Sequence, residues 1–318
     1  MATTGIGATD RAVRGRGGPG GIVGQLREGW RASNKWAYVF ILPPLIEFFV
    51  FHVWMVFSTI NISLQKWSPI GPAGWVGADN YATVLADPAF WDSMRITATY
   101  TLVTVSGGLL IALVMSEIIF RFRPRMQTFF KSAFYLPGVV SAVVISLIWI
   151  WLYQPWYGFF NYLLSLFSLG PVGWLTAPEW ALFSLMLVSL ASGHGGQIVF
   201  LTAAMGGVPS TLYEAARIDG AGEWTRFFRI TLPLLRPTLL YLIVTGIIGS
   251  FQVFTSIIVM TPEGGPLKST RTIGFMIYES AFLRARFDLA STQALLLLVV
   301  LLVFSLFVFR SMQTDVEY

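Results

Sequence analysis

Long apolar runs constrain the fold of this chain more than any other feature. Six predominantly apolar stretches lie between residues 36 and 309, each near the ~20 residues that an α-helix needs to cross ~30 Å of hydrocarbon. Lipid offers the backbone no hydrogen-bond partner, so these stretches are expected to be helices rather than open strands. The expected spans are Trp36–Phe57, Ile96–Ile119, Ala133–Leu152, Ala181–Met205, Thr238–Met260 and Ala290–Phe309.

The composition agrees with an all-α membrane protein of six transmembrane helices. Of the 318 residues, 55% are hydrophobic and 12% are charged, whereas a soluble domain carries roughly 25% charged residues. The chain has no Cys and only two His. The missing Cys excludes disulfides, thiolate metal sites and Cys nucleophiles, and the scarcity of His argues against a His-based metal centre. We therefore predict no metal site and no catalytic residue.

The basic residues predict the orientation in the membrane. Fifteen of the 21 Lys and Arg residues lie in the segment before the first span, in the connections after the second and fourth spans, and after the sixth span. Basic residues mark the cytoplasmic side, so both termini are expected in the cytoplasm. This placement explains the net charge of +5, and it argues against a nucleic-acid partner.

Three regions are expected along the chain. Residues 1–35 form a basic cytoplasmic tail that is expected to be disordered; no apolar region typical of a signal peptide follows its arginines. Residues 36–310 form the six-helix transmembrane domain, and residues 311–318 form a short cytoplasmic tail. Within the outer connection 154–180, the stretch Asn161–Phe167 is too short to span and suits an amphipathic helix at the interface.

The cytoplasmic segment 206–237, about thirty residues long, is expected to have structure of its own. Thr211 with Glu214 three residues later is a capping-box pattern, so a short helix should follow. Gly220 is a natural C-terminal cap for it. A second short helix should run from Glu223 to Arg229 and stop near Leu232-Pro233.

This segment resembles the EAA loop of bacterial binding-protein-dependent ABC importer permeases, in the carbohydrate-uptake branch of maltose and glycerol-phosphate type. The resemblance extends to the six-span layout, to the Val-Gly-x-x-Asn-Tyr element at 76–81 and to the Gly-Gly-Pro at 264–266. The loop motif stands here as Glu214-Ala215-Ala216, Asp219-Gly220-Ala221, Phe227-Phe228, Ile230-x-Leu232-Pro233 and Pro237.

The resemblance implies a type I ABC importer permease fold and a non-catalytic subunit. The loop would dock into a groove on a cytoplasmic ATPase dimer, with Glu214 contacting the ATPase and Gly220 permitting the turn. This chain contains no Gly-x-x-x-x-Gly-Lys-Ser/Thr sequence, so ATP and Mg would be bound by the partner ATPase and no cofactor by this chain. Other implied partners are a second, homologous but distinct permease, an extracytoplasmic binding protein and the lipid bilayer. The implied location is a bacterial or archaeal cytoplasmic membrane, and the implied substrate is a sugar or sugar derivative.

Polar groups inside the expected spans are the candidates for a transport pathway, because they are costly in hydrocarbon. Glu47 in the first span could line the pathway or pair with a neighbouring helix, and pairing is favoured. In the fourth span, Ser192 lies next to a glycine-rich stretch, and His194 and Gln197 share a helix face. Either this face lines the substrate cavity, or the helix is kinked and these side chains satisfy backbone groups.

The fifth span offers a second set of candidates. Gly246 and Ser250 form a small-xxx-small pattern that favours close helix packing. Gln252 and Phe254 follow at once, and amides and aromatic faces are suited to sugar hydroxyls and sugar rings. Ser250, Gln252 and Phe254 are therefore pathway candidates, against an alternative in which they only pack between helices.

Other functions remain open from the residues alone. The main alternative is a self-contained secondary transporter or channel for small polar solutes, which would need an ion-coupling residue. Glu47 and Glu117 are the only acids well inside the expected spans, and neither belongs to an obvious relay. A membrane enzyme finds no support, because zinc motifs and a Gly-x-Ser-x-Gly elbow are missing from the sequence.

Overall fold

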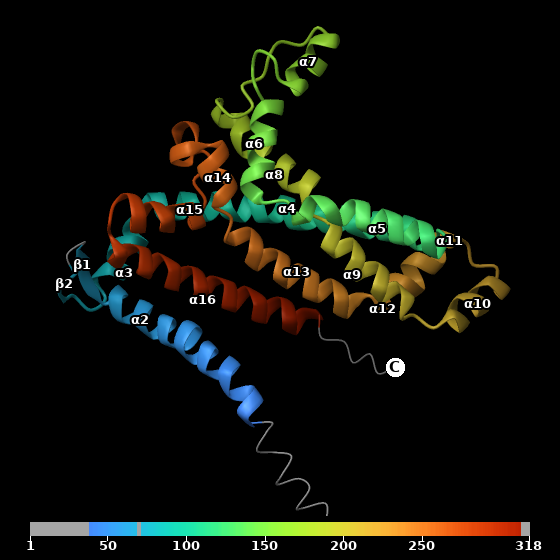
Figure 1. Ribbon diagram of the computed structural model, residues 1–318, viewed down its shortest axis with the longest axis horizontal. Helices are drawn as coiled ribbons and strands as arrows, with labels where there is room; N and C mark the ends of the chain where they lie inside the picture. The colour runs from blue at the N-terminus through green and yellow to red at the C-terminus, as the bar shows by residue number, and fades with distance from the viewer. Residues whose placement is uncertain (1–37, 69–70, 313–318) are drawn as a thin grey trace, which may run out of the picture. The chain divides into compact units, whose positions relative to one another are not determined.

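The computed structural model describes residues 38–68 and 71–312 (Figure 1). The predicted basic tail, residues 1–35, lies outside the described residues, as do residues 313–318 of the predicted cytoplasmic tail. The chain divides into two compact units, Met1–Ser58 and Thr59–Tyr318. Each unit is described by itself.

The described part of the first unit belongs to one apolar helix, Tyr38–Ser63, whose end continues into the second unit. The helix contains a π-helical turn, η1 (Phe49–Val53), followed by α2 (Trp54–Ser63). Large apolar side chains are exposed along it, for example Phe40 and Phe57. The carboxylate of Glu47 lies 4.0 Å from Nδ1 of His52, and both side chains are exposed. The structure thus gives Glu47 a neighbour on its own helix.

The second unit begins with a feature that the sequence did not predict. Two short strands, β1 (Gln65–Ser68) and β2 (Gly71–Trp75), form an antiparallel hairpin, so the expectation of an all-α chain is wrong at this point. The hairpin is held by Asn80 of α3 (Asp79–Ala86), which is buried and donates from Nδ2 to the carbonyls of Ser63 and Gln65 at 2.8 and 2.9 Å. Strands of four and five residues, Gln-Lys-Trp-Ser and Gly-Pro-Ala-Gly-Trp, leave too little hydrophobic alternation to be recognised.

The long helix α4 (Pro88–Phe120) organises the second unit. Asp87 caps it by accepting a hydrogen bond from the backbone N–H of Ala89 at 2.9 Å, so it starts earlier than the predicted Ile96. Small residues make up much of its buried face, which allows other helices to approach closely. These small buried residues are Ser93, Thr97, Thr101, Thr104, Gly108, Ala112 and Ser116.

Three of the expected spans are broken rather than continuous. The third consists of α5 (Pro124–Val139) and α6 (Ala142–Leu152), bent by 90°, and the fourth of α8 (Pro178–Ser192) and α9 (Gly195–Gly206), bent by 45°. The first bend follows Pro137-Gly138 and the second falls at Gly193, residue types that weaken a helix. The fifth expected span ends at Phe251 in α13 (Arg236–Phe251) and resumes as α14 (Thr255–Met260).

Three described helices are individually long and apolar enough to cross a membrane: Tyr38–Ser63, Pro88–Phe120 and Phe287–Ser311. Three bent pairs also meet the criterion when each pair is taken as one span, giving up to six spans among the described residues. The third such pair is Glu223–Leu234 with Arg236–Phe251, bent by 67°.

The remaining elements lie in the connections and at the C-terminal end. The predicted interfacial stretch forms the short helix α7 (Phe159–Leu166). Its buried Asn161 accepts hydrogen bonds from the backbone N–H of Val172 and from Nε1 of Trp174, and it donates to two carbonyls. The last segments are η3 (Pro262–Gly264), η4 (Pro266–Lys268), α15 (Ile273–Tyr278), η5 (Glu279–Leu283) and α16 (Phe287–Met312).

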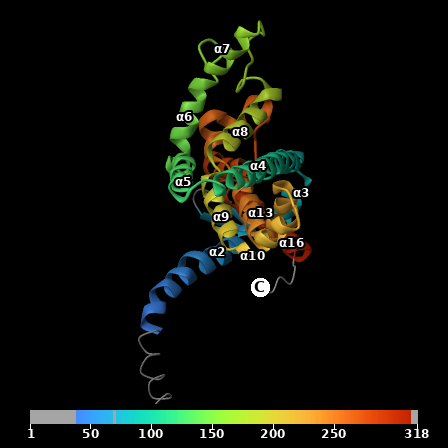
Figure 2. The same cartoon turned by 90° about the vertical axis from the view of Figure 1, so that its right-hand side faces the viewer.

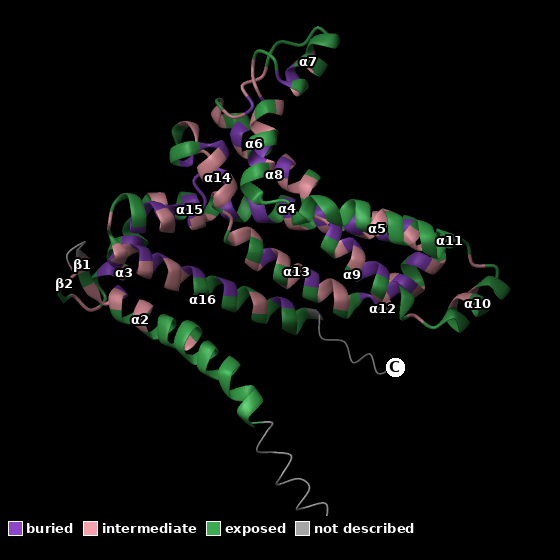
Figure 3. Cartoon of the chain, in the orientation of Figure 1, coloured by how far each residue is buried: buried purple, intermediate pink, exposed green. Residues whose placement is uncertain are grey.

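Within the second unit, α4 packs against α8, α9 and α13, and α16 packs against α13 and α15. Figures 1 and 2 show α6, α7 and α8 extending away from α9, α13 and α16. Buried residues alternate with exposed ones along α16, whereas α5 is exposed along most of its length (Figure 3). Exposed large apolar side chains on so many helices are expected where lipid is the solvent.

Candidate functional site

The first half of the loop 206–237 is the helix α10 (Ser210–Ile218), which ends in a tight C-terminal cap. Gly220 has φ = +75°, a left-handed conformation that favours glycine. The N–H of Ala221 bonds the carbonyl of Ala216 at 2.8 Å, and the N–H of Gly220 bonds that of Arg217 at 3.1 Å. These two bonds form a Schellman motif, so the expected role of Gly220 as a cap is confirmed.

The start of α10 differs from the expectation. Pro209 occupies the N-cap and no side chain caps the helix, so the capping box between Thr211 and Glu214 does not form. Because Ser210 is already helical, Thr211 lies inside the first turn and not at its edge. The ring of Pro209 fixes φ at the N-cap. The helix therefore starts at this position without the hydroxyl cap that was expected.

The second half of the loop is longer than predicted. It comprises α11 (Glu223–Arg226), the π-helical turn η2 (Phe227–Thr231) and α12 (Leu232–Leu234), and the helix continues through Leu232-Pro233. Proline has no N–H and its ring crowds the carbonyl four residues earlier. The wider π turn directly before Pro233 relieves this conflict, with the N–H of Leu232 bonding the carbonyl of Phe227.

The residues of the EAA motif lie on the surface of the loop. Glu214, Ala215, Asp219 and Gly220 are exposed, and Ala216 and Ala221 are half-buried. Three large apolar side chains beside them are also open to solvent: Ile218 (87% exposed), Trp224 (73%) and Phe228 (57%). Exposed apolar groups clustered around small residues are typical of a surface that another protein covers.

An ion-pair network and a buried aromatic ring attach the loop to the transmembrane helices. Arg121, directly after α4, pairs with Glu117 at 2.8 Å and also with Glu223 of α11. The hydrogen bond to Glu117 raises the pKa of Arg121 further above its ordinary value, so the guanidinium stays charged. Phe227 is buried in a core cluster with Ile119 and other residues of α4, α9 and α13.

A cavity of about 310 Å³ lies where two of the bent spans break. The breaks of α5/α6 and α8/α9 both border it, together with α4 and α14. We call it the hydroxyl cavity, because five hydroxyl side chains line it: Tyr100, Ser146, Ser189, Ser192 and Ser256. The other lining residues are apolar or glycine: Pro137, Gly138, Val140, Ala142, Ile145, Leu185, Val188 and Gly193.

Of the predicted pathway residues, Ser192 lines the hydroxyl cavity and His194 does not. Oγ of Ser192 accepts a hydrogen bond from Nε1 of Trp149 at 3.2 Å. The ring of His194 packs on Gly108, where an added Cβ would come within 2.2 Å of it. The ring nitrogens of His194 and Oε1 of Gln197 are shielded from solvent without a well-formed hydrogen bond in the described part of the chain.

The candidates on the fifth expected span lie around the end of α13 and do not line the hydroxyl cavity. Ser250 donates to Oγ1 of Thr101 at 2.9 Å, and Gly246 lies against Val105, so the small-xxx-small pattern packs α13 on α4 as expected. Gln252 is exposed in the break between α13 and α14. Phe254 is 40% exposed and stacks on Tyr278, with 6.0 Å between ring centroids.

The sequence reasoning missed four of the five hydroxyl residues of the cavity: Tyr100, Ser146, Ser189 and Ser256. A usable signal was present in Pro137-Gly138, which interrupts an apolar run in the same way as the glycines near His194. Broken helices in membranes are tolerated where they line a cavity, so two interrupted spans point to a shared site.

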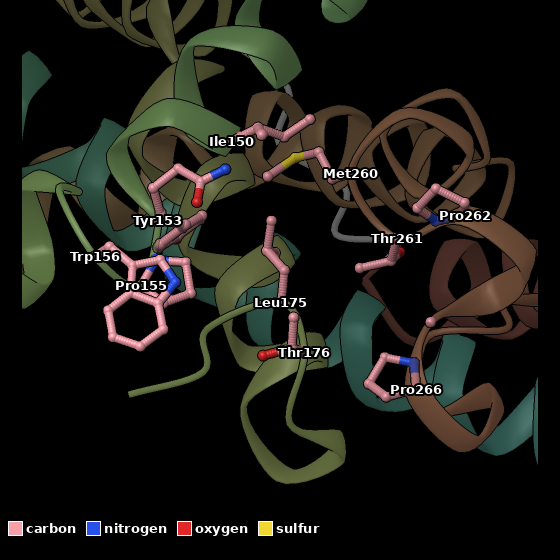
Figure 4. Close-up of a pocket in the computed structure, with 12 residues that line it drawn as sticks. Ile150, Tyr153, Pro155, Trp156, Leu175, Thr176, Met260, Thr261, Pro262 and Pro266 are labelled. Carbon is pink, nitrogen blue, oxygen red and sulfur yellow. The ribbon is translucent and has the colours of Figure 1, made fainter. Parts of the chain in front are cut away.

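A second, larger cavity of about 580 Å³ lies among the connections between spans. Tyr153, Pro155 and Trp156 border one side of it, and Thr261 and Pro262 border another (Figure 4). Trp156 is 90% exposed. Since this cavity is formed largely by connecting segments, we distinguish it from the hydroxyl cavity and call it the connection cavity.

Comparison with known proteins places the chain among transport proteins. Residues 108–314 match the family of binding-protein-dependent transport system inner membrane components. The probable ABC transporter permease protein YurN of Bacillus subtilis is 31% identical over 287 residues, covering 88% of this chain and 97% of its own length. The sn-glycerol-3-phosphate transport system permease protein UgpA of Shigella flexneri is 32% identical over 292 residues, with 90% and 97% coverage.

Solved structures agree. The crystal structure of a bacterial ABC transporter involved in the import of the acidic polysaccharide alginate contains a chain that matches with a TM-score of 0.79 and 25% identity, covering 92% of this chain and 100% of that one. A structure of the alginate transporter in complex with its alginate-pentasaccharide-bound periplasmic protein matches with a TM-score of 0.78. The chain therefore belongs to the binding-protein-dependent transport system inner membrane components and is a permease subunit of an ABC importer.

Proposed function

We propose that this chain forms one half of the membrane pathway of an ATP-driven importer that takes up a sugar or sugar derivative. The proposal takes from relatives only the broad class of sugars and their derivatives, and not the charge of the substrate: UgpA is named for glycerol 3-phosphate, and the matched structures import alginate. A second, homologous permease supplies the other half, and an extracytoplasmic binding protein delivers the substrate. The host membrane is a bacterial or archaeal cytoplasmic membrane.

The loop of α10 to α12 couples the pathway to a separate ATPase dimer, which binds ATP and Mg. The observation that carries this proposal is the exposed surface around Glu214, Ala215 and Gly220, bordered by Ile218 and Trp224. The Schellman turn supports it, because it fixes α10 relative to the rest of the loop. Alternating access then follows from two arrangements of the helices that the loop holds.

The hydroxyl cavity is the proposed substrate site of this half, since irregular backbone inside a membrane protein is retained where it lines a cavity. Its volume of about 310 Å³ falls at the lower end of the ~300–1,000 Å³ of small-molecule sites. Ser192 is the pathway residue that we retain there. Six spans with both termini in the cytoplasm complete the proposal, supported by the distribution of Lys and Arg.

Co-purification with the ATPase subunit tests the coupling. Glu214→Lys combined with Gly220→Pro should abolish ATPase binding, because it reverses a charge and removes the left-handed turn. Glu179→Lys, the same charge change on a residue at the opposite end of the fourth span, is the matched control and should leave binding intact. Unchanged ATPase binding by the double variant would refute the docking role.

The orientation of the chain in the membrane can be measured separately by labelling single introduced cysteines, because the chain has no Cys of its own. A Trp224→Cys variant should react with an impermeant thiol reagent only from the cytoplasmic side of membrane vesicles, and a Trp156→Cys variant only from the opposite side. Both side chains are well exposed, so accessibility itself is not limiting. Labelling of both positions from one side would contradict the orientation.

A further inference from the structure

We infer that the hydroxyl cavity selects an uncharged, hydroxyl-rich solute and excludes phosphorylated or carboxylated ones. This inference rests on the proposed function, since it concerns the substrate class of the same site. It separates this chain from relatives named for glycerol 3-phosphate or for the acidic polysaccharide alginate. The selectivity depends on which groups line the cavity and on where the charged residues of the lining helices lie.

The residues that line the cavity include hydroxyls, apolar groups and glycine, and none of them carries a charge. A hydroxyl both donates and accepts, so it matches a sugar or polyol hydroxyl in either direction. Oγ of Ser146 already donates to the carbonyl of Ala142 at 2.7 Å, which leaves its lone pairs to accept. Oγ of Ser192 already accepts from Trp149, which leaves its proton to donate. Ser146 therefore offers a hydrogen-bond acceptor to a solute, and Ser192 offers a donor.

The charged residues of the lining helices lie away from the cavity. On α4, Arg95 precedes Tyr100 by five residues and borders a different cavity with Lys268 and Arg271. On α5, Lys131 lies six residues before Pro137. The helices α6 and α14 carry no ionisable side chain that could pair with an anion, and α8 adds only an acid, Glu179.

An anion in this cavity would lack a cation among the described residues that line it. Moving a carboxylate or phosphate from water into a low-dielectric site is costly unless a cation or several N–H donors replace its hydration. Here the lining side chains offer five hydroxyls and no guanidinium, ammonium or imidazole group. The backbone adds no one-sided field, because the C-terminal ends of α5 and α8 border the cavity as well as the starts of α6 and α14. The imidazole of His194, which follows the lining residue Gly193 in the sequence, packs on Gly108 instead. A neutral polyhydroxyl solute loses less solvation free energy when it enters the cavity, because each of its hydroxyl groups can be hydrogen-bonded there.

Charge-selective thiol labelling tests the inference without knowing the substrate. Ser192→Cys and Ser256→Cys are made separately in the chain, which has no other cysteine, and each is studied in the complete transporter in proteoliposomes. The probes are three methanethiosulfonates of similar size: neutral hydroxyethyl, anionic sulfonatoethyl and cationic trimethylammonioethyl. Modification of this chain is read by mass spectrometry, with each rate divided by the rate for free cysteine. Trp156→Cys, at an exposed position that borders the connection cavity, is the matched control.

In the Trp156→Cys control the three normalised rates should agree within about threefold, as for an exposed thiol with weak nearby charge. In the Ser192→Cys and Ser256→Cys variants the neutral reagent should exceed the anionic one by about tenfold or more, the ratio that a modest desolvation penalty produces. Adding Ser189→Arg to Ser192→Cys should raise the anionic rate relative to the neutral one. An anionic rate equal to the neutral rate at both cavity positions overturns the inference.

The outcomes separate the inference from the proposed function. If no reagent reaches either cavity position, with or without ATP, the cavity admits no solute and the inference fails. If the neutral preference holds but the rates do not respond to ATP, the selectivity stands and the coupled transport function is refuted. If the rates respond to ATP and the anionic reagent reacts as fast as the neutral one, the transport function stands and the selectivity is refuted.

Discussion

The contact between α9 and α5 permits a prediction at two adjacent glycines. A Cβ added to Gly195 would lie 2.2 Å from the carbonyl oxygen of Phe134 and 2.5 Å from Cα of Tyr135. A Cβ added to Gly196 would meet nothing within 4 Å. Gly195→Ala and Gly196→Ala therefore add the same methyl group to neighbouring positions, one against backbone and one in open space.

The two variants should differ strongly in stability. The backbone of α5 cannot rotate away as a side chain could, so α5 and α9 must separate by roughly 1 Å to restore normal contact. Overpacking of this kind costs about 1–3 kcal/mol, and contact with backbone places Gly195→Ala towards the upper end. For Gly196→Ala we expect no loss, and a gain of up to about 1 kcal/mol because alanine favours helix more than glycine. A difference of about 3 kcal/mol is roughly 150-fold in the folding equilibrium.

The assay is the unfolding of both variants, compared with the parent transporter, in mixed detergent micelles, with uptake measured in proteoliposomes. Gly195→Ala should unfold at lower denaturing-detergent concentration and transport less, because the same contact borders the bend at His194. Gly196→Ala should match the parent in uptake and be at least as stable. Equal stability of the two variants would refute the reasoning, since it would mean that α5 and α9 are not in backbone contact.

Other predictions concern the loop of α10 to α12, for which we propose the coupling role. Gly220→Ala should destabilise the loop by about 1–2 kcal/mol, because a side chain strains the left-handed turn. Weaker co-purification with the ATPase would report this loss of stability. A smaller loss of ATPase binding for Gly220→Asn would identify the backbone conformation as the cause. Phe227→Ala should cost about 3–5 kcal/mol of stability because the ring is buried, whereas Phe228→Ala, at an exposed ring, should leave the unfolding midpoint nearly unchanged and weaken ATPase binding. A double-mutant cycle of Arg121→Ala and Glu223→Ala should give a coupling energy of only about 0.2–1 kcal/mol, since both side chains are well exposed; a value well above this range would show that the pair is buried by a partner.

The sequence predicted the loop in greater detail than it predicted the spans. Gly220 was recognised because left-handed backbone favours one residue type, which makes its signal local. The capping box failed because Pro209 offered a competing way to begin the helix. The second short helix was ended too early because Pro233 normally stops a helix, and the π turn that accommodates it has no sequence signature of its own.

The breaks in the spans could not be predicted from hydropathy. An apolar run of about twenty residues has the same mean hydropathy whether it is straight or bent, so the 90° bend after Pro137-Gly138 was missed. His194 is a pathway candidate from the sequence because it is polar and lies in a span, and a kinked helix is the alternative. Its place against Gly108 depends on a contact between two helices that are distant in sequence. The hydroxyl residues carried no signal, since serine and threonine commonly bond their own helix carbonyls, as Thr104 does here.

The connection between the loop and α13 indicates how a displacement of the loop would reach the hydroxyl cavity. Only Leu235 separates α12 from α13, so the helix Glu223–Leu234 turns by 67° directly into a membrane helix without a flexible linker. Leu235 is buried in the same core cluster as Phe227, which fixes the bend from inside. Arg121 links the loop to α4, and α4 contributes Tyr100 to the hydroxyl cavity. Since the ion pair alone is worth little, the buried ring of Phe227 and the short connection at Leu235 would transmit most of a displacement of the loop. A partner that displaces the loop would thereby move α4 and α13 together, and the glycine contacts of α9 with α4 and α5 would carry the same displacement to the breaks that border the cavity.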